Sequence, residues 1–344
     1  MSKALKLIIV LLAVVLVLSI TAGVSLGTVS IPFKKVWQII FAQILNKKLD
    51  VPLNEISIVW QIRLPRVLTG AIVGAGLALA GAVIQSLVRN SLADPYLLGI
   101  SSGACTGAVV MILFASSLFN MALTGLEVYF AAFLGAVVAF MLVFVIAAGG
   151  TGLNKGLNPV RMILSGLAVS YIFSALTNFM VYLSQHNGAE SAMFWMLGSL
   201  GGARWGRLGV PFITVILMLI IFMLNARNLN ALLLSDESAA AVGVDIIKFR
   251  RILFILSSVL TGVIVAVSGS IGFVGLIVPH AVRLIAGADH RRVLPIGALT
   301  GAIFLIWADL FSRTVLAPRE LPLGIITGFV GAPFFIWLLT RNKH

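Results

Sequence analysis

A few serine, histidine and glycine spacings in this chain could support chemistry. Residues 99–103 read Gly-Ile-Ser-Ser-Gly, the G-x-S-x-G pattern in which a serine acts as a nucleophile. That role needs a β-strand before the serine and a base nearby, whereas the apolar residues around this segment predict a helix. His280 and His290 are separated by ten residues without a carboxylate or cysteine at metal-ligand spacing. A structural or gating role therefore fits the two histidines better than a metal site.

The sequence contains no phosphate-binding G-x-x-x-x-G-K-[ST] motif. The nearest segment, residues 149–155, lacks the required spacing and has no Ser or Thr after Lys155. If the protein uses ATP, another chain must bind it. We therefore expect no nucleotide, no other cofactor and no metal to be bound by this chain, and we do not expect it to be an enzyme.

Two groups of polar residues lie inside apolar segments. Asp309 has Arg313 four residues later, so an acid in a membrane span could relay protons or could pair with the arginine on its own helix. Ser170, Ser174, Thr177 and Asn178 share one helical face. Such a stripe either lines a translocation path or bonds back to its own helix.

The composition identifies the elements that must position these residues. Of the 344 residues, 60% are hydrophobic and only 10% are charged, and the mean hydropathy is +1.12. The apolar runs are continuous, which predicts membrane-spanning helices and not a β-barrel. The formal charge of +13 comes from Lys and Arg between the runs, where membrane topology and anionic lipid account for it better than nucleic acid. The single Cys105 excludes a disulfide framework.

The apolar runs predict about ten spans. They lie near residues 7–26, 64–88, 98–118, 127–148, 159–184, 209–226, 249–270, 274–286, 293–313 and 321–340. The first run could instead be a signal peptide. An even number of spans places both termini on one side, and the basic residues near both ends favour the cytoplasm. Residues 28–62 are then an extracytoplasmic segment.

Glycine patterns add detail to this arrangement. Residues 274–286 are too few to cross the membrane, so we expect a half-helix reached through the glycine-rich residues 269–275. Residues 67–73 and 259–265 both read Val-Leu-Thr-Gly-x-Ile-Val, which indicates an inverted repeat unless the match is accidental. Small residues four apart allow close helix packing, either within the chain or at a dimer seam: Gly70, Gly74, Ala78; Gly297, Gly301; Gly324, Gly328.

Several sequence blocks occur together and in order along nearly the whole chain. They are Arg63-Leu64-Pro65-Arg66, Asn90-Ser91-Leu92-Ala93-Asp94-Pro95, Leu98 to Ala104, Trp195-Met196-Leu197-Gly198-Ser199, Gly272 to His280, Asp289-His290-Arg291, Glu320-Leu321-Pro322-Leu323-Gly324 and Gly331-Ala332-Pro333. This set resembles the FecCD family of ABC importer permeases, which carry iron–siderophore complexes, haem and cobalamin. Ser91 stands where the family usually has proline, which affects the expected rigidity of that loop.

The resemblance implies one polytopic domain over residues 1–344, with an all-α, cobalamin-permease-like bundle of about ten spans and an inverted repeat. It also implies residence in the bacterial cytoplasmic (inner) membrane. The expected partners are a second permease subunit, two cytoplasmic ATPase subunits that use ATP-Mg, an extracytoplasmic binding protein and membrane lipid. A single set of motifs permits a homodimer, and a paralogous partner stays open.

The resemblance also assigns roles to residues of this sequence. The loop 227–248, with Asp236, Glu237, Ala240 and Gly243, looks like the segment that couples the permease to its ATPase. Arg63, Arg66 and Arg313 correspond to arginines that dock the binding protein, unless they only anchor the membrane interface. The gate and pathway residues are Asn90, Leu92, Asn158, Pro159, Ser170, Ser174 and Asn178.

The function implied is ATP-driven import of an iron complex, a ferric siderophore or haem, by alternating access. A cobalamin importer is an alternative within the family. An ion-coupled secondary transporter would need a charged residue near the midplane, for which only Asp309 comes close. A membrane enzyme would need a nucleophile and base together. The sequence leaves open which chelate is carried.

Overall fold

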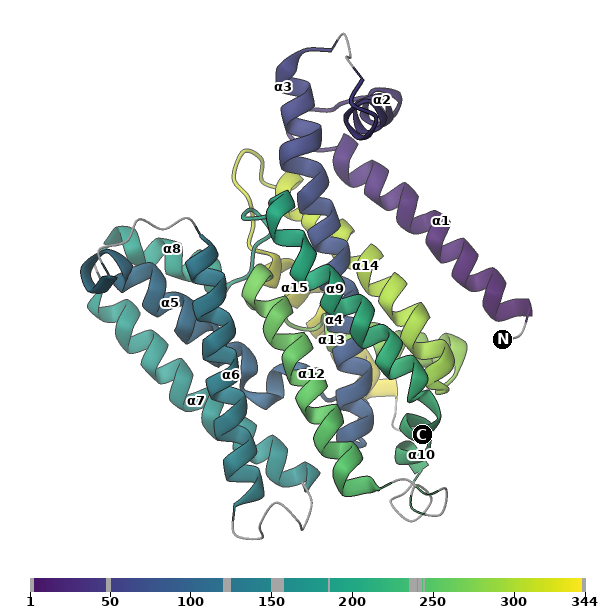
Figure 1. Cartoon of the computed structure of the whole chain (residues 1–344), viewed down its shortest axis with the longest axis vertical. Coiled ribbons are helices and arrows are strands. Elements are labelled where there is room, and N and C mark those ends of the chain that lie inside the picture. Colours follow the sequence, from purple (N-terminus) through teal and green to yellow (C-terminus); the bar gives the residue numbers. More distant parts are fainter. Residues whose placement is uncertain are drawn as a thin grey trace.

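The computed structural model shows an all-helical bundle and describes residues 3–47, 51–119, 125–149, 158–184, 186–234, 240, 243 and 245–341 (Figure 1). One helix corresponds to each expected span: α1 (Lys3–Ser25), α4 (Leu64–Val88), α5 (Ile100–Phe119), α6 (Leu126–Ala148), α7 (Pro159–Leu183), α9 (Trp205–Leu224), α12 (Ile246–Ser268), α13 (Val274–Ala286), α14 (His290–Thr314) and α15 (Leu323–Arg341). Seven helices of the described chain are long and apolar enough to cross a membrane, and the apolar parts of α5, α13 and α15 are shorter. The predicted helical membrane fold is confirmed.

Short helices lie at the two ends of the bundle. At one end, called here the α2 end, are α2 (Phe33–Ile44), α3 (Leu53–Ile56) and the π-helical turn η1 (Ser57–Arg63), which continues directly into α4 (Figure 1). These elements make up much of the segment 28–62. At the other end, the α10 end, lies α10 (Ala226–Leu234). Both chain ends point away from the α2 end (Figure 1).

Helix α4 is the central helix of the bundle, and α14 packs along it. Most residues of α4 are buried, whereas α1 is largely exposed. A Cβ built on Gly74 would stand 2.0 Å from the carbonyl oxygen of Gly301. Two helix backbones can approach this closely only where side chains are absent. Packing within the chain is thus confirmed for Gly74 and Gly301, while Gly297 and Gly328 face open space.

The glycine-rich residues 269–275 break the chain between two helices as expected. Gly269, with φ of 66°, ends α12, and α13 occupies residues Val274–Ala286, the predicted half-helix. The two copies of the Val-Leu-Thr-Gly-x-Ile-Val sequence lie in α4 and α12, which run in opposite directions (Figure 1). An inverted repeat would place equivalent residues at opposite ends of the bundle, but both copies lie in the half nearer the α2 end. The opposite helix directions therefore agree with an inverted repeat, whereas the positions of the two copies do not.

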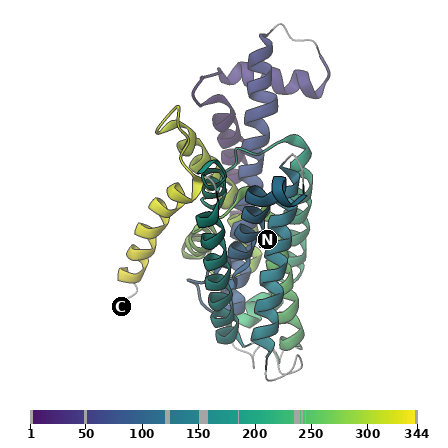
Figure 2. The ribbon, with the colours of Figure 1, turned by 90° about the vertical axis from the view of Figure 1, so that its left-hand side faces the viewer.

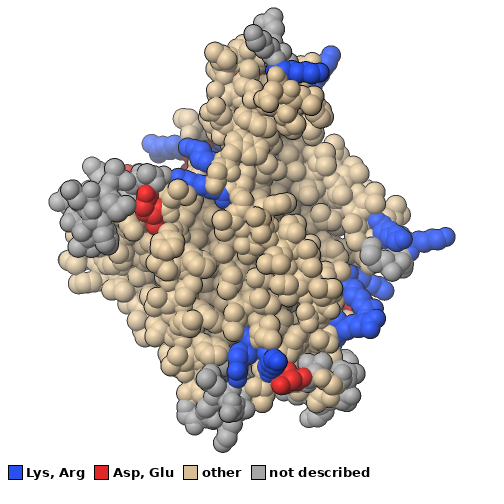
Figure 3. Space-filling model, in the orientation of Figure 1, with Lys and Arg blue, Asp and Glu red and all other residues tan. Residues whose placement is uncertain are grey.

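Two features of the surface bear on function. Helix α15 leans away from the other helices (Figure 2) and exposes Phe329, Val330 and Ile336. On the face shown in Figure 3, Lys and Arg gather toward the margins and leave a broad uncharged area between them. An uncharged band between charged ends is typical of a protein that spans a bilayer.

Candidate functional site

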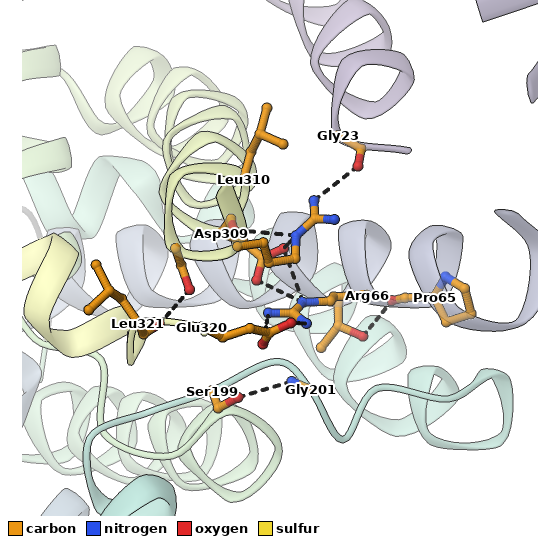
Figure 4. Close-up of polar contacts among 12 residues, drawn as sticks. Gly23, Pro65, Arg66, Ser199, Gly201, Asp309, Leu310, Glu320 and Leu321 are labelled. Carbon is orange, nitrogen blue, oxygen red and sulfur yellow. Dashed lines mark hydrogen bonds and ion pairs between the residues drawn. The ribbon is translucent and has the colours of Figure 1, made fainter. Parts of the chain in front are cut away.

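The first candidate site is a cluster of arginines and acids at the α2 end. Arg66 at the start of α4 donates from Nε to the carboxylate of Asp309 on α14 at 2.9 Å. Its Nη1 and Nη2 each donate to one oxygen of Glu320 at 2.9 Å. Figure 4 shows Arg66 between these two carboxylates. The planar guanidinium thus makes bidentate contact with Glu320, a geometry that lysine cannot reproduce.

Asp309 is shared between two arginines. Its side chain is only 1% exposed, and Arg313, one turn further along α14, contacts it at 3.0 Å through Nε. Arg313 also donates from Nη2 to the carbonyl oxygen of Gly23 on α1. The expected pairing of Asp309 with Arg313 is therefore confirmed, and Arg66 joins it from a second helix.

Arg63 binds backbone oxygens near the end of α1. Its Nη1 donates to the carbonyls of Val24 at 3.0 Å and Ser25 at 3.1 Å, and its Nη2 donates to Val29. The last carbonyls of a helix have no partner within it, and the helix dipole favours a cation there. The buried Arg63 is held in place by this contact and ties the segment before α4 to α1.

The three arginines line a cavity of about 190 Å³ at the α2 end. Glu320 and Pro318 also line it, together with residues of the α1–α2 connection. Glu320 is 47% exposed at its side chain, whereas Arg66 and Arg313 are 8% exposed. Three guanidinium groups meet two carboxylates in this cluster, so one positive charge is left over beside an open cavity.

The expected gate residues lie at helix ends. Asn90 follows α4, and its side chain accepts the N–H of Leu92 at 2.9 Å. Asn158 caps α7 by accepting the N–H of Val160 at 2.8 Å, and Pro159 is the first residue of that helix. Such asparagine caps fix the direction in which a chain enters or leaves a helix. The chain is therefore held in a defined turn just after α4 and at the first residues of α7.

Asp94 occupies the same loop as Asn90 and caps the short helix η2 (Pro95–Leu98). Its carboxylate accepts the N–H of Tyr96 at 2.9 Å. Burial raises the pKa of Asp94 to about 6, although hydrogen bonds from the backbone of Tyr96 and Phe273 act in the opposite direction. A buried acid with a raised pKa thus lies in the turn between α4 and α5.

The polar stripe on α7 divides into two parts. Thr177 is buried, and its hydroxyl contacts that of Thr106 on α5 at 2.7 Å. Ser174 and Asn178 are exposed and Ser170 is half-buried. Tyr171 and Tyr182 extend the exposed face, with 68% and 85% of their surfaces accessible. The outward surface of this span therefore carries a stripe of polar residues from Tyr171 to Tyr182, beside exposed apolar residues such as Ile172 and Phe179.

The expected coupling loop follows α10. Asp236 and Glu237 lie outside the described residues. Ala240 and Gly243 are exposed, and the N–H of Gly243, at φ of 79°, donates to the carbonyl of Ala240 at 2.9 Å. This turn leads into α12, whose first residue follows the helix-capping Asp245.

Helix α10 is bound to its neighbours by a polar network that the sequence did not reveal. The Asn230 Oδ1 lies 2.7 Å from Nδ1 of the buried His290, and the Asn230 amide donates to Asp289 at 2.7 Å. The other His290 ring nitrogen lies 2.7 Å from the hydroxyl of Ser86 on α4. Burial raises the pKa of Asp289, but the contacts with Asn230, Arg291 and Arg292 outweigh it and lower that pKa overall.

The remaining sequence motifs have other positions. Ser101 lies in α5 after a helical turn and donates to the hydroxyl of Ser270 at 3.0 Å. His280 lies on α13 against the ring of Phe334, whereas His290 contacts Asn230 and Ser86. Within the described ranges, no group of three or more His, Cys, Asp and Glu could hold a metal ion. Lys155 lies outside those ranges.

Glu320 and Asn230 were not predicted as functional residues, because their partners are distant in the sequence. Glu320 pairs with Arg66 across 254 residues, and Asn230 pairs with His290 across 60. No local spacing relates such partners. Only the position of Glu320 next to Leu321 and Pro322, in one of the ordered blocks, marked it at all.

Known proteins resemble this chain over almost all of its length. The profile of the FecCD transport family matches residues 11–341. The haemin transport system permease protein HmuU of Yersinia pestis is 38% identical over 97% of this chain and 95% of its own. The cobalamin import system permease protein BtuC of Halobacterium salinarum is 42% identical over 85% of this chain and 76% of its own.

A solved structure has the same architecture. An inward-facing metal-chelate type ABC transporter superimposes with a TM-score of 0.83 at 30% sequence identity, covering 98% of this chain and 99% of that one. The residues matched by the family profile, 11–341, include all of those in the arginine cluster. The chain therefore belongs to the FecCD transport family and is a membrane-spanning ABC transporter permease.

Proposed function

We propose that this permease forms the translocation path of an ATP-driven importer for iron complexes, either haem or a ferric siderophore. The observation that carries this proposal is the exposed polar face of α7, formed by Tyr171, Ser174, Asn178 and Tyr182. Hydroxyl and amide groups are costly against lipid tails, so a span with such a face should border a water-filled path or another subunit. The haemin permease among the relatives supports an iron complex as cargo.

The path requires a second permease subunit in this proposal. Helix α15 leans away from the bundle (Figure 2), so apolar residues such as Phe329 and Ile336 are not covered by the other helices of the chain. A second copy, placed against α7 and α15, would cover both faces and enclose the path between the two chains. A homodimer is consistent with the single set of motifs in the sequence.

The energy and the cargo come from other chains. The turn at Ala240 and Gly243, together with Asp236 and Glu237, is proposed to dock on the ATPase. The transporter would hold two ATPase subunits, which bind ATP-Mg at the cytoplasmic face. The arginine cavity at the α2 end is proposed to receive an acidic residue of an extracytoplasmic binding protein, because it holds an excess positive charge. Both termini are then cytoplasmic, and the membrane is the bacterial inner membrane.

Rocking of the two permease chains would alternately open the path at its two ends. Asn90, Leu92, Asn158 and Pro159 lie at the ends of α4 and α7, where loops would close the inner opening. Cobalamin is the second candidate cargo, favoured by the relatives that import it. An ion-coupled mechanism through Asp309 is disfavoured, because two guanidinium groups already bind this carboxylate.

Uptake of radiolabelled haem and of a ferric siderophore by intact, iron-starved cells tests the cargo. We expect uptake of one of them to be lost on deletion of the gene and restored by a copy of it. If uptake of both is unchanged and cobalamin uptake is lost, the cargo is cobalamin and not an iron complex. Uptake that needs the membrane potential but not ATP would contradict the importer mechanism itself.

A matched pair of variants tests the path. Ser174→Trp places a bulky ring on the polar face of α7, whereas Val14→Trp places the same ring on the exposed apolar face of α1. We expect Ser174→Trp to abolish uptake and Val14→Trp to retain it, at equal amounts of protein in the membrane. Equal uptake by both variants would remove α7 from the path.

A further inference from the structure

Helix α2 has two apolar sides, and protein covers only one of them. Val36, Ile39, Ile40 and Ala42 are buried. The first three pack with Val24 of α1 and with residues of η1 and α4 in a small core of their own. This side fixes α2 to the bundle and gives the helix a defined orientation.

The second side consists of large exposed residues. Phe33, Phe41, Ile44 and Leu45 expose 54%, 55%, 61% and 58% of their surfaces. Phe41 and Ile44 are eight and eleven residues after Phe33, so these three lie on one side of the helix. Leu45 directly follows the last helical residue. Trp37, four residues after Phe33, adds a half-buried ring that lies 5.5 Å from the ring of Phe41.

Polar residues border this exposed apolar stripe. Lys34 and Gln38 are exposed on the adjoining side of α2, and Lys47 is exposed just beyond the helix. Lys35 is instead paired with Glu55 of α3 at 2.5 Å. A helix with an apolar stripe, an aromatic residue and flanking lysines is typical of a helix that lies in the interface between lipid tails and headgroups.

The position of α2 agrees with that environment. Figure 1 shows α2 almost end-on beside the end of α1, and Figure 2 shows it crossing the end of the bundle. On α1, Val10, Leu11, Val14, Val17 and Leu18 are all at least 50% exposed. They form the lipid-facing side of a span, and α2 packs against the end of that span.

We propose that α2 is an interfacial helix that inserts its Phe33, Phe41, Ile44 and Leu45 side into the bilayer leaflet at the α2 end. Lys34 and Lys47 then lie among lipid headgroups, where anionic headgroups attract basic side chains. Because α2 contacts η1 and pairs with α3, lipid binding also holds the segment that presents Arg63. This proposal holds whatever cargo the permease carries.

Spin labels at two matched positions measure the depth of each side of α2. The single native cysteine, Cys105, is buried, so Cys105→Ala provides a background for Phe41→Cys on the apolar stripe and Gln38→Cys on the polar side. The labelled full chain is placed in nanodiscs of phosphatidylethanolamine and phosphatidylglycerol. Collision with oxygen reports lipid exposure, and collision with a water-soluble nickel chelate reports exposure to water.

We expect the label at position 41 to be accessible to oxygen and shielded from nickel, with the reverse at position 38. High nickel access at both positions would show that both sides of α2 are exposed to water and would overturn the proposal. Shielding of position 41 from both reagents would mean that protein covers the stripe, which also overturns it. Neither result depends on transport, so the proposal that α2 inserts into lipid can be wrong while the proposed import function is right, and the reverse.

The headgroup contact has its own measurement. Replacing phosphatidylcholine by phosphatidylglycerol in the nanodiscs should raise the melting temperature of the parent protein more than that of the Lys34→Gln, Lys47→Gln double variant. An equal rise in both proteins would overturn the proposed headgroup contact of the two lysines.

Discussion

The carbonyl oxygen of Gly301 lies 2.0 Å from the position that a Cβ on Gly74 would occupy, and a Cβ on Gly301 would lie 2.3 Å from the oxygen of Gly74. The contact is therefore reciprocal and joins two backbones. A side-chain neighbour could rotate away from an added methyl group, but a helix backbone cannot. Any side chain at either position must push α4 and α14 apart.

Gly74→Ala should accordingly destabilise the protein by about 1–3 kcal/mol, the usual cost of overpacking a close helix contact. Gly297→Ala on α14 is the matched control, because nothing lies within 4 Å of its added methyl group. The control should keep or slightly raise stability, since alanine favours helix more than glycine does. Thermal unfolding in detergent, followed by tryptophan fluorescence, measures both. Similar losses in the two variants would contradict the backbone contact.

Asp309→Asn should be strongly destabilising. The change leaves the buried guanidinium of Arg313 without its carboxylate and removes one of two from Arg66. Breaking a buried ion pair in this way typically costs about 3–5 kcal/mol. Glu320→Gln is the control, because its side chain is 47% exposed and an exposed pair contributes about 0–1 kcal/mol. A melting temperature for Asp309→Asn equal to that of the control would mean that Asp309 is dispensable.

Much of the fold could be predicted because lipid imposes a simple rule on the sequence. Each expected span has a helix, and α13 has the predicted bounds, since Gly269 and Gly287 interrupt the apolar residues on both sides. Helix α8 (His186–Met196) was not expected, because His186, Asn187 and Glu190 make it too polar and too short for a span. The start of α9 at Trp205 was also missed, since Arg207 interrupts the apolar run.

A pH dependence should follow from Asp94. Its folded pKa of about 6 exceeds the ordinary value of about 3.9. Between these values the folded protein binds more protons than the unfolded chain, so stability from this residue falls as the pH rises through the window. Asp94→Asn keeps an oxygen that can accept the N–H of Tyr96 and removes the titration.

The melting temperature of Asp94→Asn relative to the parent should therefore be higher at about pH 7.5 than at about pH 4.5. The comparison between the two proteins at each pH removes the contribution of other titrating groups. A difference that does not change with pH would place the pKa of Asp94 at its ordinary value.

Asn230→Leu should loosen α10 from α4 and α14. The substitution removes hydrogen bonds to His290 and Asp289 and leaves buried polar atoms unsatisfied, at a cost of about 1–3 kcal/mol. Asn228→Leu on the same helix is the control, because its amide makes a contact of 3.5 Å to Asn225. In the assembled transporter, we expect Asn230→Leu to reduce stimulation of ATP hydrolysis by the binding protein and to retain the basal rate. Unchanged stimulation would mean that the hydrogen bonds of Asn230 do not take part in coupling ATP hydrolysis to the binding protein.

The candidate site was less accessible from the sequence than the fold. Arg63, Arg66 and Arg313 were identified through a resemblance, and the structure adds that each already binds oxygens of this chain. Asn90 and Asn158 were expected at gates, and the structure shows them capping turns. Side-chain partners on different helices leave no periodic signal, so these contacts become visible only once the helices are assembled.

The α4–α14 pair is joined at three levels along its length. Ser86 and His290 contact near the α10 end, Gly74 and Gly301 in the middle, and Arg66 and Asp309 at the α2 end. From His290 to Asp309 the helix extends about 29 Å at 1.5 Å per residue. Because α4 and α14 are in contact at both ends and in the middle, they cannot slide past each other and should move as one rigid unit. If α10 tilts this unit at one end, the other end, at the cavity lined by the three arginines, should move in the opposite direction.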